Sequence, residues 1–138
     1  MNRKVVSLMV VLLSLFLIGC DNGHVSLSGR VTYSDNDAPL EAGTVFFQPV
    51  VGAEQFYARG EIASDGKYVL ATHRPKDGLP PGKYQVYVNG AFLYEDEKEI
   101  PLISNKYTRA ETSELEVEVN RSTKTFDFQV DRAPGSKK

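Results

Sequence analysis

The feature that most constrains this chain is an alternation of apolar and polar residues with a period of two. In the segments 114–119 and 126–131 every second residue is apolar, and the residues between them are polar or charged. Successive side chains of a β-strand point to opposite faces, so this period predicts strands with one buried and one solvated face. No long segment follows the i, i+3, i+4, i+7 spacing of an amphipathic helix. The sequence therefore predicts an all-β fold.

The same pattern predicts seven strands. Their ranges are 25–33, 44–48, 56–62, 68–72, 83–89, 114–119 and 126–131. Pro49 cannot donate to a strand ladder, Asp65-Gly66 favours a two-residue hairpin turn, and the segment 73–82 is rich in Pro and Gly. Short strands separated in this way are typical of an antiparallel β-sandwich. The region 90–113 is the least regular part of the chain and carries no predicted strand.

Composition fits one globular domain and excludes several classes of function. The 138 residues are 41% hydrophobic and 25% charged, which is close to the average for globular domains. A formal net charge of −2 predicts no nucleic-acid partner. One cysteine cannot form an internal disulfide or a cysteine-rich metal site, and two histidines far apart in sequence predict no histidine metal cluster. We therefore expect no metal and no cofactor.

Residues 1–19 have the organisation of a secretory signal peptide. Arg3 and Lys4 give a positive start, and residues 5–18 follow without a charge. As a helix this run is about 21 Å long, which is too short for a hydrocarbon core of about 30 Å. Its length is typical of the apolar region of a signal peptide.

The apolar run ends in Leu17-Ile18-Gly19-Cys20, which contains the only cysteine and resembles the lipobox of bacterial lipoproteins. In that family the thiol is lipidated, the chain is cut before the cysteine, and the new amino terminus is acylated. The resemblance implies that Cys20 is the lipid attachment site, which carries palmitate or a similar acyl chain, and that residues 20–24 are a short lipidated tether. Two or more acyl chains give a stable membrane anchor. An unlipidated signal peptide with a chance cysteine is the alternative.

The lipobox implies a bacterial cell envelope and leaves the membrane open. Asp21 resembles the inner-membrane retention signal of enteric-type lipoproteins, a rule that differs between bacteria.

A second resemblance covers residues 25–131, which precede a tail at 132–138 that we expect to be flexible. Several short blocks occur in the order expected of a carboxypeptidase-regulatory-like, or transthyretin-like, domain. They are Gly29-Arg30-Val31, Pro39-Leu40, Gly43-Thr44-Val45-Phe46-Phe47, Asp65-Gly66-Lys67-Tyr68 and Gly82-Lys83-Tyr84. The resemblance implies a seven-stranded Greek-key sandwich. Tyr68 and Tyr84 are expected to bury their rings and direct their hydroxyls to backbone partners.

One enzymatic relative of that family, the hydroxyisourate hydrolases, is the alternative enzyme interpretation. Those enzymes resemble one another in a His and Arg cluster and a Tyr-Arg-Gly-Ser carboxyl terminus, whereas this chain ends in Ser136-Lys137-Lys138. His24 lies in the tether and His73 begins a loop, so no positioned acid–base partner is near either of them in sequence. We therefore expect no catalytic residues and no enzyme activity.

Two acidic segments are candidates for cation binding. Residues 35–37 and the acidic loop Glu95 to Glu99 offer hard oxygen ligands, but neither has the EF-hand pattern. Solvated acidic loops are the simpler interpretation, and whether the Glu95 to Glu99 loop binds calcium stays open. His73 and Arg74, beside Lys76 and Asp77, are candidates for a small anion site. The alternative is an ordinary exposed loop with solvated charges.

Exposed aromatic side chains are the candidate ligand-facing residues. They are Tyr57, Tyr87, Phe92 and Tyr94. Such rings stack on sugars or anchor a protein partner, and the alternative is cross-strand pairing that covers the outer sheet. We therefore expect a non-enzymatic, membrane-anchored envelope lipoprotein with a binding or structural role. Its partner is an unidentified envelope protein or a glycan, with a carbohydrate-binding module as the alternative and the oligomeric state open.

Overall fold

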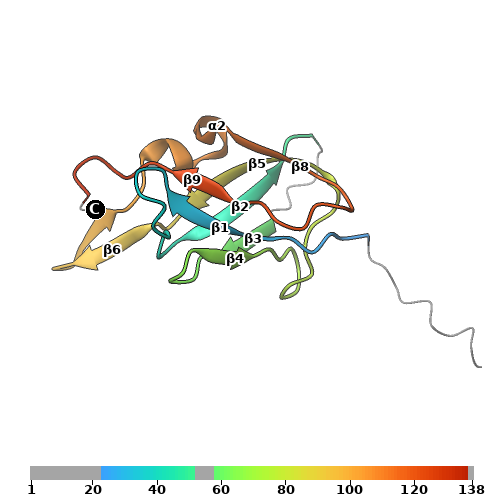
Figure 1. Cartoon of the computed structure of the whole chain (residues 1–138), viewed down its shortest axis with the longest axis horizontal. Coiled ribbons are helices and arrows are strands. Elements are labelled where there is room, and N and C mark those ends of the chain that lie inside the picture. Colours follow the sequence, from blue (N-terminus) through green and yellow to red (C-terminus); the bar gives the residue numbers. More distant parts are fainter. Residues whose placement is uncertain (1–22, 52–57, 137–138) are drawn as a thin grey trace, which may run out of the picture.

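The computed structural model describes residues 23–51 and 58–136, which form nine strands and two short helical segments (Figure 1). The strands are β1 (Ser28–Tyr33), β2 (Thr44–Pro49), β3 (Ala58–Glu61), β4 (Lys67–Val69), β5 (Gly82–Asn89), β6 (Phe92–Glu95), β7 (Lys98–Pro101), β8 (Leu115–Val119) and β9 (Phe128–Val130). The helical segments are the 3₁₀ helix η1 (Asn105–Thr108) and the helix α2 (Ala110–Ser113). No helix in these ranges is long and apolar enough to cross a bilayer.

Two sheets pack face to face around the core. One has the strand order β4-β1-β9 and the other β3-β2-β5-β8, while β6 and β7 form a separate two-stranded sheet. The seven strands of the two large sheets are those that the period of two predicts, and the prediction of an all-β sandwich is confirmed. One pairing differs from the expected antiparallel arrangement, because β9 runs parallel to β1.

The buried face of each strand supplies the core. In β3 and β9 the alternation of buried and exposed residues is complete, and the glutamates of β8 are exposed. Phe47 is fully buried, and its ring centroid lies 6.4 Å from that of Tyr68 and 6.1 Å from that of Tyr84. Tyr68 donates its hydroxyl to the carbonyl of Phe126, and Tyr84 donates to the carbonyl of Pro80 at 2.7 Å. Both tyrosines therefore combine a buried ring with a backbone partner, as expected.

The region 90–113 is more regular than the sequence predicts. It contains the β6–β7 hairpin, whose turn residues Asp96 and Glu97 have φ values of 49° and 65°. The turn at Asp65-Gly66 joins β3 and β4, which belong to different sheets. Arg59 and Ala71 nevertheless exchange backbone hydrogen bonds of 2.9 Å, so the two arms of this connection run antiparallel beside each other, as the hairpin motif predicts.

The strand directions gather the loops at two ends of the sandwich (Figure 1). The entry end comprises residues 23–27, 70–81 and 120–127, which are linked by the bridges Val25–Leu79 and Ser28–Thr125. The far end comprises residues 34–43, 90–103 and 131–136, where Ile103 pairs with Arg132. These two ends carry the features that bear on function.

Candidate functional site

The chain joins the sandwich at Val25. Its N–H donates to the carbonyl of Leu79 at 2.7 Å, and the N–H of Leu79 donates back to Val25 at 3.0 Å. Gly78 has a φ of +74°, and a Cβ at that position would lie 2.0 Å from the carbonyl oxygen of Val25. This close approach requires glycine. Cys20 and Asp21 lie outside the described residues.

The loop 72–78 beside this junction is organised by one carboxylate. Asp77 accepts the backbone N–H of Thr72 at 2.6 Å, of His73 at 3.0 Å and of Arg74 at 2.9 Å. Partial burial opposes ionisation of this carboxyl, but the three hydrogen bonds outweigh it and lower the pKa of Asp77 to about 2. The loop is therefore a defined structure at neutral pH.

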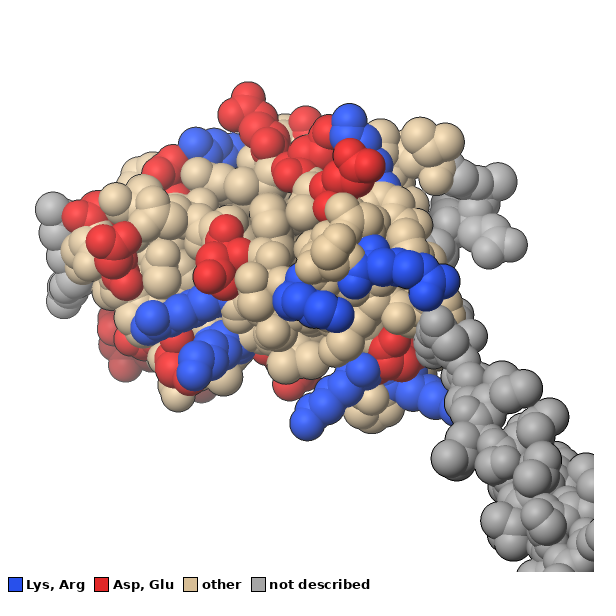
Figure 2. Space-filling view, turned by 45° about the vertical axis from the view of Figure 1, so that its right-hand side comes forward, with Lys and Arg blue, Asp and Glu red and all other residues tan. Residues whose placement is uncertain are grey.

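Basic side chains surround the junction. Arg74 and Lys76 are exposed on the loop 72–78, and Arg121 and Lys124 are exposed on the segment 120–127. Figure 2, which turns this end toward the viewer, shows several Lys and Arg side chains with Asp and Glu side chains among them. Within the described ranges 23–27, 70–81 and 120–127, the acidic residues are Asp77 and Asp127, and Asp127 accepts the backbone N–H of Arg30 at 2.8 Å. Both of these carboxylates are therefore used by the backbone.

The far end has the opposite charge. Its exposed acidic residues are Asp35, Asp37, Glu41, Glu95, Asp96, Glu97 and Glu99. Lys98 and Arg132 are the basic residues of the same ranges. The sandwich is therefore electrically asymmetric from one end to the other.

A shallow hollow of about 880 Å³ lies beside the basic loop. Its lining includes Phe46 of β2, Arg59 of β3, Lys67 of β4 and the segment 72–76. The charged side chains that line it are all exposed to solvent. The structure thus brings the predicted anion-binding residues His73, Arg74 and Lys76 together with Arg59 and Phe46, which sequence reasoning missed because their approach depends on tertiary structure.

The candidate aromatic residues do not form one surface. The ring of Tyr87 stacks on that of Phe46 across β2 and β5, with centroids 5.1 Å apart and planes 9° apart. Phe92 and Tyr94 meet edge to face on the separate β6–β7 hairpin, with centroids 5.3 Å apart. Tyr94 is 67% exposed, and its hydroxyl donates to Glu99 at 3.2 Å. Tyr57 lies outside the described residues.

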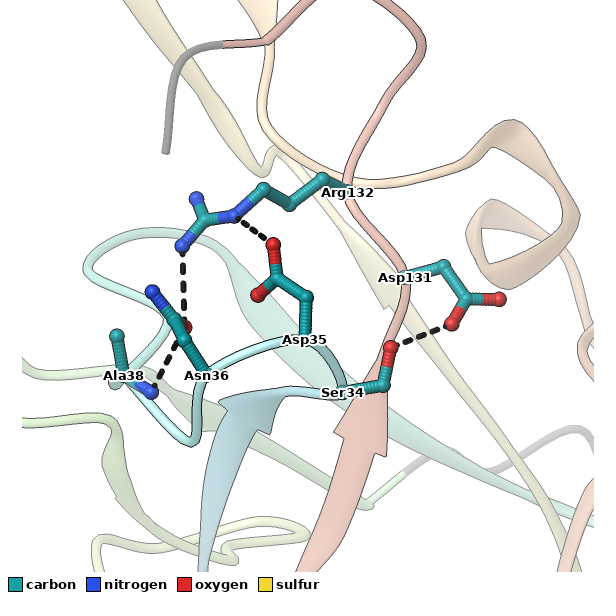
Figure 3. A network of polar contacts seen from close by, with 6 residues as sticks. All are labelled: Ser34, Asp35, Asn36, Ala38, Asp131 and Arg132. Carbon is teal, nitrogen blue, oxygen red and sulfur yellow. Dashed lines mark hydrogen bonds and ion pairs between the residues drawn. The ribbon is translucent and has the colours of Figure 1, made fainter.

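The acidic turn at 35–37 takes part in a network that joins β1 to the chain after β9 (Figure 3). Arg132 donates from Nε to Asp35 at 3.0 Å and from Nη2 to Asn36 at 3.3 Å, and its guanidinium lies 3.6 Å from the ring centroid of Tyr33. Asn36 also accepts the N–H of Ala38 at 3.1 Å. Within the described ranges no group of three or more possible protein ligands is arranged to hold a metal ion. The oxygens of this turn are instead used as structural hydrogen-bond acceptors.

A second polar contact closes the same end. Asp131 accepts from Ser34 at 2.6 Å and forms an ion pair with Lys106 at 2.7 Å. The hydrogen bond from Lys106, supported by those from Ser34 and Tyr107, lowers the pKa of Asp131 to about 2.

No protein-family model matches this chain, and no curated protein matches it. Among solved structures, it resembles a variant of BcpA, the major pilin subunit of Bacillus cereus, with a TM-score of 0.51 and 14% identity over 80% of this chain and 30% of that one. The fold is that of a β-sandwich found in bacterial pilins.

Two further solved structures resemble the chain less closely. The group B streptococcus pilus 2b backbone protein gives a TM-score of 0.44 and 11% identity over 80% of this chain and 42% of that one. A 9R-lipoxygenase from Cyanothece PCC8801 gives a TM-score of 0.41 and 16% identity over 83% of this chain and 18% of that one. The chain thus spans less than half the length of each of these proteins. Likeness at such identities identifies the fold alone, because one fold hosts many functions.

Proposed function

We propose that this protein is a non-enzymatic, lipid-anchored protein of the bacterial cell envelope, whose sandwich has a structural or binding role at the membrane surface. Lipid on Cys20 supplies the anchor, and residues 20–24 supply the tether. The observation that carries the proposal is the start of the folded domain at Val25, which already pairs with Leu79. The five residues between the lipid and that pairing span at most about 18 Å. The domain would therefore lie against the bilayer.

The pilin-like fold favours the structural half of this role. BcpA is a pilin subunit, and a comparable part in an envelope assembly is what we propose here. We also propose that residues 25–131 are a carboxypeptidase-regulatory-like domain. Support comes from the motif blocks, which fall on strands and turns of the sandwich: Gly66 is in a turn with a φ of +82°, and Tyr84 is buried in β5.

The anchor is tested by replacing its acceptor. Cells that produce the full chain are given a radiolabelled or alkyne-bearing palmitate analogue, and incorporation is compared for the natural protein, Cys20→Ala and Asn22→Ala. We expect label in the natural protein and in Asn22→Ala, which leaves the lipobox intact, and none in Cys20→Ala. Label in Cys20→Ala would contradict the anchor. Fractionation of the labelled protein then reports which membrane holds it.

The non-enzymatic part of the proposal has its own test. His73 is exposed, and its backbone N–H bonds to Asp77, which is a structural use of this position. The purified full chain should not turn over hydroxyisourate. Turnover that disappears in His73→Ala would establish the hydrolase alternative.

Glycan binding is a second candidate, and the observation that favours it is the exposure of Tyr94 beside Phe92. Aromatic faces of this kind stack on sugar rings. Binding of the purified protein to isolated envelope glycans should then weaken at least tenfold in Tyr94→Ala, in line with a loss of about 1.4 kcal/mol or more for a central ring. Tyr87→Phe, which keeps the stacked ring on Phe46, is the control. Unchanged binding in Tyr94→Ala would remove this candidate.

A further inference from the structure

Two loops place basic side chains on either side of the point where the chain enters the sandwich. Leu79 ties the loop 72–78 to Val25, and the carbonyl of Lys124 accepts the N–H of Ser28 at 3.2 Å. Both contacts are to the first strand-like residues of the fold. Backbone hydrogen bonds therefore fix the two loops that carry Arg74, Lys76 and Lys124 relative to the start of the folded domain.

These basic side chains form no ion pair with a carboxylate within the described ranges. Lys67, Lys83 and Lys106 each form an ion pair with a carboxylate. Arg74, Lys76 and Lys124 form none there, and the nearby carboxylate of Asp77 is occupied by three backbone N–H groups. Lys76 lies at a φ of +62° in this loop. The loop 72–78 thus presents exposed positive charge on a defined backbone.

We infer that the entry end of the sandwich binds the anionic phospholipid surface to which the chain is tethered, so that the far end points away from the bilayer. This inference rests on the proposed lipid anchor for the position of the membrane. The cations are exposed and divided between two loops, instead of being buried in one pocket, which fits an extended sheet of phosphate headgroups better than a small anion. The same surface repels the acidic far end.

The size of the effect follows from simple electrostatics. Each basic residue near an anionic leaflet strengthens contact by roughly fivefold, and the effect decays within a Debye length of about 8–10 Å. Loss of Arg74 and Lys76 together should therefore weaken contact by about 25-fold at low salt, and high salt should abolish the difference.

The sequence contains no Trp, so a single introduced Trp is a specific fluorescent reporter of its position. Pro75→Trp places one indole at the exposed tip of the basic loop, and Tyr94→Trp places one on the far hairpin. Each full-length, lipidated protein is reconstituted in phosphatidylcholine vesicles with or without phosphatidylglycerol, and quenching by a brominated lipid is measured. We expect phosphatidylglycerol to increase quenching at position 75 in a salt-dependent way and to leave position 94 unquenched.

Matched charge variants complete the test. Arg74→Gln with Lys76→Asn, where Asn tolerates the left-handed backbone, should abolish the effect of phosphatidylglycerol at position 75. Lys98→Gln with Arg109→Gln removes the same charge from exposed sites outside the entry end and should leave that effect within about twofold. Equal quenching in both vesicle types, or an equal loss in the two double variants, would overturn the inference. Dextran sulfate can be added to the protein in neutral vesicles as a soluble polyanion. If it changes the fluorescence at position 75 as much as phosphatidylglycerol does, the inference is also overturned, because the surface would then bind any polyanion.

The anchor and the oriented contact fail in different ways. Without the anchor, the protein does not float with pure phosphatidylcholine vesicles. Flotation with those vesicles but no response to phosphatidylglycerol leaves the anchor in place and removes the lipid-binding entry end.

Discussion

Tyr68 links the two sides of the core through both its ring and its hydroxyl. The residue is 2% exposed, and burial, reinforced by the charge of Asp127, raises the pKa of its phenol, so the hydroxyl remains a donor at neutral pH. Tyr68→Phe should lower the free energy of unfolding by about 1–2 kcal/mol, because the carbonyl of Phe126 loses a buried partner. Urea denaturation measures this loss. Tyr94→Phe, at an exposed site, should change the value by less than about 0.5 kcal/mol, and equal losses in the two variants would contradict the explanation.

The contacts of Arg132 depend on the shape of its guanidinium group as well as on its positive charge. Its guanidinium bonds to Asp35 and Asn36 while lying over the ring of Tyr33. A lysine cannot reproduce this forked and stacked geometry. Arg132→Lys should therefore destabilise the protein by about 1–2 kcal/mol. Thermal unfolding of Arg132→Lys is compared with that of Arg109→Lys, an exposed control. If Arg132→Lys is as stable as the natural protein, only the positive charge matters at this position.

At the scale of elements, the loop 72–78 predicts an acid-sensitive stability. The pKa of Asp77 is about 2 in the folded protein, below its ordinary value of 3.8, because backbone N–H groups favour the carboxylate. A carboxyl with a lowered folded pKa stabilises the fold above its unfolded pKa, and this stabilisation is lost as the pH falls through the folded pKa. The natural protein should thus lose stability between about pH 4 and pH 2.

Asp77→Asn isolates this contribution. It should cost about 1–2 kcal/mol at neutral pH, after allowance for the loop's contact with water, and it should flatten the pH dependence between pH 4 and pH 2 only in part, because the pKa of Asp131 is also about 2. Asp96→Asn, in the exposed hairpin turn, is the control and should retain the full acid dependence. Urea midpoints measured across this range give the comparison, and identical curves for the two variants would argue against the loop.

The elements that the sequence predicts are those with one buried face. Strands β3, β5 and β9 alternate between core and solvent, so their period of two is visible without a structure. The β6–β7 hairpin is missed because it is mostly exposed on both faces and has no such period. Its turn uses Asp96 and Glu97 at positive φ, where Asn and Gly are the usual signal. The parallel pairing of β9 with β1 depends on contacts distant in sequence and leaves no local pattern.

The candidate surfaces were only partly accessible from sequence for the same reason. The charges of 73–77 are visible as a run, but their position beside Lys124 and the chain entry depends on the pairing of Val25 with Leu79 and of Ser28 with Lys124. The alternation in β5 predicts that Tyr87 points away from the core, and Tyr87 lies on that face. Its stack on Phe46 could be found only once the register of β2 and β5 was known.

On the scale of the whole molecule, the near-neutral total charge conceals its distribution. The formal net charge is −2, yet the basic loops lie at the entry end and most of the acidic loops at the far end. Both ends are attached to one core, so their relative orientation is set by the rigidity of the sandwich. A protein with this arrangement can hold one end at a charged surface and present the other to a partner only while that core remains intact.

Phe47 tests whether the two ends share one cooperative core. Its buried ring contacts Tyr68, Tyr84 and Phe126 between the sheets. Phe47→Ala should cost about 3–5 kcal/mol, a large part of the 5–15 kcal/mol that is typical of a domain. Because one core carries both ends, the Pro75→Trp and Tyr94→Trp reporters should unfold at the same urea concentration, and Phe47→Ala should shift both midpoints equally. Val69→Ala, at a site 42% exposed, should shift neither by more than a small amount. Separate midpoints for the two reporters would mean that the far end folds independently, and an orientation set at the membrane would then not be transmitted to it.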